Sequence, residues 1–362
     1  IFCASKNKLQ EIWHGRRLGV DAAPDVLMID QAYSNESLAD KLIDLLDDAS
    51  QVVYSFSRAD TGELVQQSLS MLRRLARQGK ICPTQLADLD PLVNAMRLFK
   101  SEAEVAQMTA ACAISVTAHK RAMSVCKVGM HEYQLAAELH HQFTTQGSQR
   151  LAYGSIVAGG ENACILHYTN NDQVLQDGDL VLIDAGCELD HYASDITRTF
   201  PVNGRFSEAQ KTIYELVLAA HEAALACIKP GAVYTDMQDA AVKVITQGLI
   251  EIGLLTGELE QNIEQQTFRK FYMHNIGHWL GMDVHDVGVY KLDGASRPLI
   301  AGMVTTVEPG IYIDPEDLDI APQWRGIGVR IEDNILVTDH GYRNLTANLP
   351  VSVADIETIM AS

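Results

Sequence analysis

The sequence predicts an α+β domain preceded by a smaller α/β domain, and two patterns carry this prediction. Residues 1–93 alternate short strand-like runs with helical runs. The remainder repeats one arrangement, a helix, a glycine break, a second helix and then strands, at an interval of about 100 residues. We therefore divide the chain into domains 1–93 and 94–362, and we expect the second to be pseudo-twofold with its functional site where the repeats join.

The first domain is predicted from the spacing of its apolar residues. A segment with two prolines follows it and is predicted to be a linker. The expected elements are a helix near Glu36–Asp48, a strand at Gln51–Phe56, a helix near Asp60–Gln78 and the linker Ile81–Asn94 with Pro83 and Pro91.

Each repeat of the second domain opens with a capping-box pattern, a serine followed three residues later by Glu or Gln. Glycine then marks the predicted end of each helix. The two repeats could also be chance similarity between amphipathic helix pairs. The predicted helices start at Ser101 and Ser207, break at Gly129 and Gly231, and end their second helices at Gly147 and Gly248, before strand-rich stretches Ser155–Phe200 and Phe271–Asp286.

Composition limits the class of protein. The 362 residues carry a net charge of −19, which argues against nucleic acid as a partner because phosphate binding requires clustered Lys and Arg. No apolar run approaches the ~18 residues that a membrane span needs. The seven cysteines are scattered and form no C-x-x-C pair, which is typical of a reducing cytoplasm.

Four carboxylates and one histidine lie in apolar or glycine-flanked segments: Asp184 in LVLIDAG, Asp195 in ASDITRTF, His278 in NIGHWLG, Glu308 in TVEPGIY and Glu332 in VRIEDN. Unpaired buried carboxylates cost several kcal/mol, so four of them require compensating positive charge. Two divalent cations supply it, and oxygen-rich ligands with one imidazole suit ions such as Mn²⁺. Two metals about 3.5–4 Å apart polarise a carbonyl and hold a hydroxide, which is hydrolytic chemistry.

Single members of this set also have ordinary interpretations. Asp184 and Asp195 are separated by a polar turn, so a hairpin would place both on one face, although Asp195 alone could be a turn acid. His274 and His278 have the spacing of a zincin helix, but position 275 is Asn, so the catalytic Glu of that motif is absent. The sequence has no Gly-rich phosphate loop, Cys–His pair or serine elbow.

The order Asp, Asp, His, Glu, Glu in the settings DAGCELDHYASDITRTF, HNIGHWLGMDVHD, VEPGIY and GIGVRIEDN resembles the pita-bread metallopeptidases. That family includes methionine aminopeptidase, prolidase and the Xaa-Pro aminopeptidases (aminopeptidase P). The resemblance to the last group extends to EIWHGRRLG, MRLFKSEAE, ILHYT and TRTFPVNG, so it covers essentially the whole chain. Against that family the first domain is short, and we expect the chain to enter it partway, as in a truncated form.

The resemblance implies a role for each residue. Asp184 would bind one metal, Asp195 would bridge two, and His278, Glu308 and Glu332 would complete the set, with Glu308 also carrying a proton. His167, His274 and His285 would line the substrate pocket, and Arg330 and Tyr312 would orient carboxylates. The ordinary alternatives are core histidines, for His285 above all, and surface positions for Arg330 and Tyr312.

The function so implied is release of the first residue from Xaa-Pro-Yaa peptides by a cytoplasmic enzyme with two Mn²⁺, or another ion such as Co²⁺. Prolidase, which cleaves Xaa-Pro dipeptides, is the alternative. A metal-free binding protein or a creatinase-type hydrolase of the same fold would lack ligands that are present here, and a redox metalloprotein would need thiolate or several histidine ligands. The resemblance also implies a homo-oligomer, a dimer or a tetramer.

Overall fold

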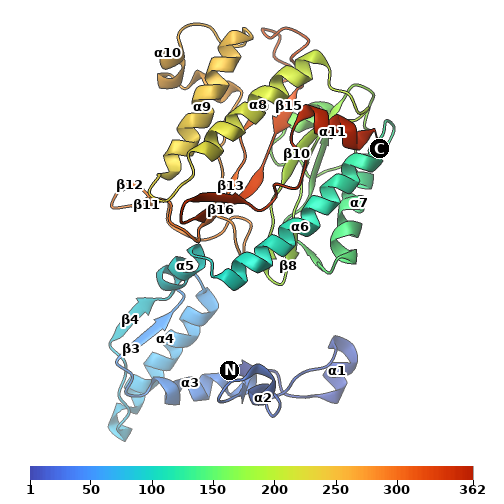
Figure 1. Cartoon of the computed structure of the whole chain (residues 1–362). Coiled ribbons are helices and arrows are strands. Elements are labelled where there is room, and N and C mark those ends of the chain that lie inside the picture. The colour runs from blue at the N-terminus through green and yellow to red at the C-terminus, as the bar shows by residue number, and fades with distance from the viewer. Residues whose placement is uncertain (362) are drawn as a thin grey trace. The chain divides into compact units, whose positions relative to one another are not determined.

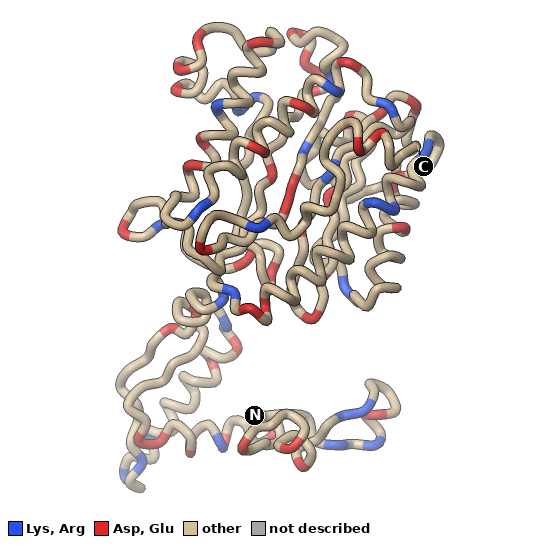
Figure 2. Tube along the Cα trace, in the orientation of Figure 1, with Lys and Arg blue, Asp and Glu red and all other residues tan. Residues whose placement is uncertain are grey.

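The computed structural model describes residues 1–361, which divide into two compact units at Asn94/Ala95. Acidic residues outnumber basic ones, 47 to 28 over the whole sequence, and both kinds are distributed along the trace in Figure 2. Among the described residues no helix has the length and apolar character required to cross a membrane.

The first unit is built on short strands and amphipathic helices, as its sequence pattern predicts. Its core is formed by apolar side chains of α3, β3 and α4, among them Val52 and Leu69. The elements are β1 (Phe2–Cys3), α1 (Lys8–His14), α2 (Ala23–Leu27), β2 (Tyr33–Ser34), η1 (Asn35–Ser37), α3 (Leu38–Leu46), β3 (Gln51–Tyr54), α4 (Ala59–Arg74), η2 (Leu75–Gln78) and β4 (Gln85–Asp88). The predicted helices and strand between residues 36 and 78 are therefore confirmed.

The prediction that Ile81–Asn94 is a linker is wrong. Within Ile81–Asn94, β4 pairs in parallel with β3, and α5 (Asp90–Leu98) begins. The prolines that indicated a linker occupy permitted places: Pro83 lies before the strand, and Pro91 lies in the first turn of α5, where a missing N–H costs nothing.

Two helix pairs form the outer part of the second unit: α6 (Glu102–Val125) with α7 (Glu132–Thr145), and α8 (Glu208–Ala226) with α9 (Tyr234–Glu251). Both predicted capping boxes, at Ser101 and Ser207, are present. The predicted end at Gly248 is wrong, because α9 continues through it. A Cβ at Gly248 would lie 2.3 Å from a methyl carbon of Leu216 on α8, so this glycine permits close helix packing and does not stop the helix.

Strands of the second unit form small antiparallel sheets beneath these helices. α7 packs against β6, and α8 packs against β13 and β15 (Figure 1). The main sheets have the orders β10-β7-β6 and β13-β16-β17, and a bridge between Thr197 and Glu332 connects them. The strands are β5 (Arg150–Leu151), β6 (Ile156–Gly159), β7 (Leu180–Asp184), β8 (Cys187–Leu189), β9 (Tyr192–Ala193), β10 (Thr197–Pro201), β11 (Lys291–Leu292), β12 (Ala295–Ser296), β13 (Val304–Val307), β14 (Gly310–Tyr312), β15 (Gly328–Arg330), β16 (Asp333–Thr338) and β17 (Gly341–Asn344).

The stretch Phe271–Asp286 was predicted to be strand-rich, and this is wrong. Its residues, all described, form an irregular loop with one bridge, between Trp279 and Thr305. The loop is buried at Trp279 and Leu280, which explains the apolar pattern without a strand. The remaining helical elements are η3 (Gly160–Cys164), α10 (Leu259–Glu264), η4 (Thr267–Lys270) and α11 (Val353–Met360).

Candidate active site

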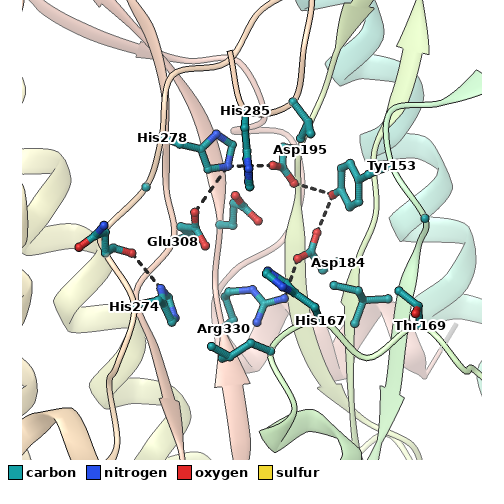
Figure 3. Close-up of a pocket in the computed structure, with 17 residues that line it drawn as sticks. Tyr153, His167, Thr169, Asp184, Asp195, His274, His278, His285, Glu308 and Arg330 are labelled. Carbon is teal, nitrogen blue, oxygen red and sulfur yellow. Dashed lines mark hydrogen bonds and ion pairs between the residues drawn. The ribbon is translucent and has the colours of Figure 1, made fainter. Parts of the chain in front are cut away.

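A cavity of about 450 Å³ in the second unit brings the predicted site residues together (Figure 3). This volume is in the range of small-molecule sites. All five predicted metal ligands and all three predicted pocket histidines line it. They come from both halves of the unit: β7 and the residues just before β10 on one side, and the 271–286 loop, the residue after β13 and the junction of β15 with β16 on the other. The lining residues used below are Tyr153, His167, Thr169, Asp184, Asp195, His274, His278, His285, Glu308, Arg330 and Glu332.

The two aspartates lie at the open end of a hairpin, as predicted. β7 pairs antiparallel with β10, Asp184 lies opposite Thr197, and Asp195 lies two residues before that position. A Cβ on Gly186 would lie only 1.7 Å from the carbonyl oxygen of Ser194, so glycine is required there for the strands to approach. The backbone of Asp195 is further held by Asn334: Asp195 N donates to Asn334 Oδ1 (3.0 Å), and Asn334 Nδ2 donates back to the Asp195 carbonyl.

The two glutamates approach from the second half. Glu308 follows β13 and accepts a hydrogen bond from Thr306 Oγ1 (3.3 Å), while Glu332 lies between β15 and β16 and is buried. Thr197 Oγ1 donates to Glu332 Oε2 at 2.6 Å. Because the bridge between Thr197 and Glu332 also ties their backbones, the register of the two sheets fixes this carboxylate against the aspartate hairpin.

His278 presents one ring nitrogen to these carboxylates. Its Nδ1–H donates to the Trp279 carbonyl (3.0 Å), so Nε2 faces Asp195 Oδ2 at 3.3 Å and Glu308 Oε1 at 3.6 Å. Burial disfavours the imidazolium, but the hydrogen bond and charge of Asp195 outweigh it and raise the pKa of His278 to about 9. A carbonyl on Nδ1 with Nε2 aimed at acids is the orientation of a metal-ligating histidine.

The cluster has an excess of negative charge. Burial and the neighbouring acids raise the pKa of Glu332 well above its usual range, and burial raises that of Glu308 to about 7. Burial also raises the pKa of Asp184, although the charge of Arg330 opposes it. Ligand atoms of Asp195, His278 and Glu332 all lie within 4.8 Å of one another. Carboxylate oxygens with one imidazole nitrogen, crowded at this distance, fit divalent cations.

A chain of hydrogen bonds extends from the carboxylates to His274. Arg330 Nη2 donates to Asp184 Oδ2 (2.6 Å), and Arg330 Nη1 donates to Tyr312 Oη (3.0 Å), which contacts His274 Nε2 at 2.8 Å. His274 Nδ1–H donates to the Asn275 carbonyl (2.8 Å). Burial, with the charge of Arg330, lowers the pKa of His274 to about 4. Neutral His274 therefore accepts from Tyr312, and both ring nitrogens have partners. Tyr312 is buried behind the cavity lining, in which it takes no part.

His167 and His285 are the exposed imidazoles of the pocket. His285 lies against His278, with ring centroids 4.2 Å apart, and His167 comes from the loop after η3 on the opposite wall, beside Thr169 (Figure 3). These two side chains and the carboxylate cluster enclose the space in which a ligand would lie.

The sequence interpretation missed Tyr153. Its hydroxyl lies 2.5 Å from an oxygen of Asp184 and 2.5 Å from an oxygen of Asp195, and it can donate its proton to only one of them at a time. Burial and the charges of both aspartates raise its pKa well above the usual range. The available signal was a tyrosine beside Gly154 just before an apolar strand, which is too common to single out. Thr197 and Asn334 were missed for the same reason.

Fold and site together define a metal-dependent hydrolase. A model of metallopeptidase family M24 matches residues 106–339, and a model of the aminopeptidase P N-terminal domain matches residues 1–54. The chain belongs to metallopeptidase family M24, with the pita-bread fold that its motifs resemble.

Relatives named Xaa-Pro aminopeptidase match the whole chain. The protein of Escherichia coli is 45% identical over all of this chain and 82% of its own length, and human Xaa-Pro aminopeptidase 3 is 35% identical over 99% of this chain and 69% of its own. Among solved structures, Pseudomonas aeruginosa aminopeptidase PepP superposes with a TM-score of 0.98 at 48% identity, covering 99% of this chain and 82% of that one. A variant of E. coli aminopeptidase P in complex with substrate gives 0.97 at 45%, covering 99% and 82%.

Proposed function

We propose that the protein is an Xaa-Pro aminopeptidase that uses two divalent metal ions to release the first residue of peptides with proline in second position. The observation that carries the proposal is the convergence of Asp184, Asp195, His278, Glu308 and Glu332 in one cavity of an M24 fold. Relatives of this name at 45–46% identity over essentially the full chain support the choice of substrate.

The metals would be held by these five side chains, with Asp184 on one ion and Asp195 shared between two. Four carboxylates and one imidazole favour Mn²⁺, with Co²⁺ as a second candidate. When bound, such ions polarise a peptide carbonyl and supply a hydroxide nucleophile at neutral pH.

The other residues bind, orient and move protons. Arg330 donates to Asp184 and to Tyr312, and Tyr312 in turn contacts His274. Arg330 and Tyr312 therefore orient the Asp184 carboxylate and fix His274 in one wall of the pocket. Both nitrogens of His274 are occupied, so the donor toward the scissile carbonyl is assigned to the exposed His285, and His167 is assigned to holding the substrate near the metals. Glu308, which lines the cavity beside His278, is assigned the transfer of a proton during turnover.

The second candidate is prolidase, which shares the ligands and the fold. A proline nitrogen in the scissile bond has no hydrogen, so both activities must recognise the shape of the ring. A dipeptide specialist also requires a cationic side chain for the free carboxylate after proline. Arg330 is the only Lys or Arg among the described residues that line the cavity, and Asp184 already occupies its Nη2. The pocket therefore favours the longer peptide.

The test compares kcat/KM for an Xaa-Pro-Yaa peptide with that for the corresponding Xaa-Pro dipeptide, on one preparation of protein loaded with Mn²⁺. We expect the longer peptide to be preferred by at least about tenfold, which corresponds to about 1.4 kcal/mol of transition-state discrimination. Preference for the dipeptide would make the protein a prolidase, and preference for a non-proline second residue would exclude both.

The proposal extends to organisation and location. Residues 1–93 and 94–362 are proposed as an α/β domain and a catalytic domain, in a homodimer or homotetramer that light scattering would distinguish. All seven cysteines are free thiols in this structure, which supports a reducing cytoplasm.

A further inference from the structure

Glu132, the first residue of α7, is a fully buried carboxylate without a cationic partner among the described residues. Four donors surround it. Its Oε1 accepts from Gly159 N (2.8 Å) and Asn162 Nδ2 (3.0 Å), and its Oε2 accepts from Tyr168 Oη (2.8 Å) and Gln173 N (2.9 Å). The charge is thus stabilised by neutral donors and by the N-terminus of a 14-residue helix.

These donors share one feature: they lie at both ends and in the middle of a single segment, residues 159–173. The backbone of Glu132 also contributes, because its N–H donates to the Gln173 carbonyl (3.0 Å). The second half of the segment, after η3, contains no regular element and includes His167 and Thr169 of the cavity wall. One buried side chain therefore holds an irregular segment that carries two pocket residues.

Neighbouring side chains of this segment point alternately toward the cavity and toward Glu132. His167 and Thr169 are exposed toward the cavity, whereas Tyr168 between them is buried and ends on Glu132. Asn171 supports the same stretch by accepting from Val157 N (2.9 Å) and donating to the Ser155 carbonyl (2.8 Å). The position of His167 is thus set by a buried neighbour that faces the opposite way.

We propose that Glu132 is a positioning residue for substrate binding, which acts through Tyr168 to place His167 against the peptide. This inference rests on the proposed function, because it assigns His167 to the substrate. Glu132 touches neither the cavity nor the proposed metal ligands, so its removal should weaken peptide binding without removing metal.

The perturbation is Glu132→Gln, which keeps the shape but directs an NH₂ group at two of the four donors. Tyr168→Phe removes only the connecting hydroxyl. The matched control is Tyr214→Phe, because Tyr214 is also a buried tyrosine and donates one hydrogen bond, to the Val351 carbonyl (2.8 Å), outside the cavity. Each change is also made in a His167→Ala background, on full-length protein loaded with Mn²⁺.

We expect KM for an Xaa-Pro-Yaa peptide to rise about tenfold in Glu132→Gln and about threefold in Tyr168→Phe. We expect kcat to change less than about threefold and metal content to stay at the wild-type value. Tyr214→Phe should leave KM unchanged. In the His167→Ala background the effects of the first two substitutions should largely disappear, because the group that they position is gone.

An unchanged KM, the same fold-change with and without His167, or loss of metal from Glu132→Gln would each overturn the inference. If Glu132→Gln does not fold, the cycle of Tyr168→Phe with His167→Ala decides alone. Failure of the proposed function is recognised separately, because wild-type protein and Tyr214→Phe would then both fail to cleave the peptide. In that case the dissociation constant of the same peptide, measured by calorimetry, takes the place of KM in the comparison of single and double variants.

Discussion

Asp286 is a buried carboxylate shared by two cations, and its replacement by Asn should destabilise the second unit strongly. Its side chain is 1% exposed and pairs with Lys100 Nζ at 3.0 Å and with Arg97 Nη2 at 2.5 Å. Lys100 is equally buried, with no other carboxylate within ion-pair distance among the described residues, whereas Arg97 also pairs with the exposed Asp283 (2.7 Å). In Asp286→Asn, Lys100 therefore keeps its charge without a counter-ion.

The magnitude follows from this asymmetry. Removing one partner of a buried pair costs about 3–5 kcal/mol, because the remaining charge is left desolvated. Lys100→Met leaves Asp286 paired with Arg97, so it loses one charged hydrogen bond, worth about 1.5–3 kcal/mol. We therefore expect Asp286→Asn to lower the free energy of unfolding more than Lys100→Met does.

Dependence on pH adds a second check. Burial lowers the pKa of Lys100 although Asp286 opposes the shift, so the folded protein binds fewer protons than the unfolded chain just below the ordinary value of 10.5. Stability consequently rises with pH in that window. Without Asp286 the pKa falls further and the window widens, so the deficit of Asp286→Asn should shrink between pH 7 and 10.

The assay is urea unfolding of wild type and both variants at pH 7 and at pH 9.5, followed by the fluorescence of the tryptophans, of which Trp279 is buried in this unit. A cost below about 1 kcal/mol for Asp286→Asn, or a larger cost for Lys100→Met, would refute the reasoning. Since Asp286 follows His285 directly, KM should also rise in the less stable variant.

Three further outcomes are expected. Chelation should abolish peptidase activity and Mn²⁺ should restore it better than Mg²⁺; full activity in protein shown to be metal-free by elemental analysis would exclude a metal mechanism. Asp195→Asn should lose at least one metal ion and lower kcat by orders of magnitude with the fold retained, and wild-type metal content and rate would reduce Asp195 to a turn residue. Burial lowers the pKa of His119 to about 4, so its contribution to stability is present above about pH 6.5 and is lost as pH falls toward 4. As the pH is lowered from 6.5 to 4, the free energy of unfolding should therefore fall by about 3 kcal/mol less in His119→Gln than in wild type. The same pH dependence in both proteins would show that folding does not lower the pKa of His119.

The sequence predicted the parts of the site that depend on local pattern. Asp184 and Asp195 were placed together because a polar turn between two apolar runs makes a hairpin, and the helices beginning after Ser101 and Ser207 were placed by their capping boxes. The assignment of His278 came from the resemblance of its flanking residues and did not come from spacing.

What escaped prediction depends on contacts between distant segments. Asn334 holds the backbone of Asp195 across 139 residues, and Tyr153 bridges two aspartates that lie 31 and 42 residues further along the chain. The periodicity of apolar residues reports local structure and does not reveal contacts between residues so far apart in the sequence. The 271–286 loop was mistaken for strands because a buried loop and a buried strand share apolar composition. Its close contacts instead require glycine at two positions: a Cβ at Gly277 would lie 2.2 Å from the Thr306 carbonyl oxygen, and a Cβ at Gly281 would lie 2.0 Å from Asp286 Oδ2.

The long separation of the ligands along the chain has a consequence for biosynthesis. Asp184 is made 332 − 184 = 148 residues before Glu332, an interval of roughly 7–30 s at ~5–20 residues per second. During that time the aspartate hairpin exists without Glu332 and also without Asn334, which fixes the backbone of Asp195. Both missing groups then arrive together on β16 and its preceding residue. The set of five ligands is therefore complete only once Glu332 has been made, so binding of metal by all five side chains follows the synthesis of both helix pairs.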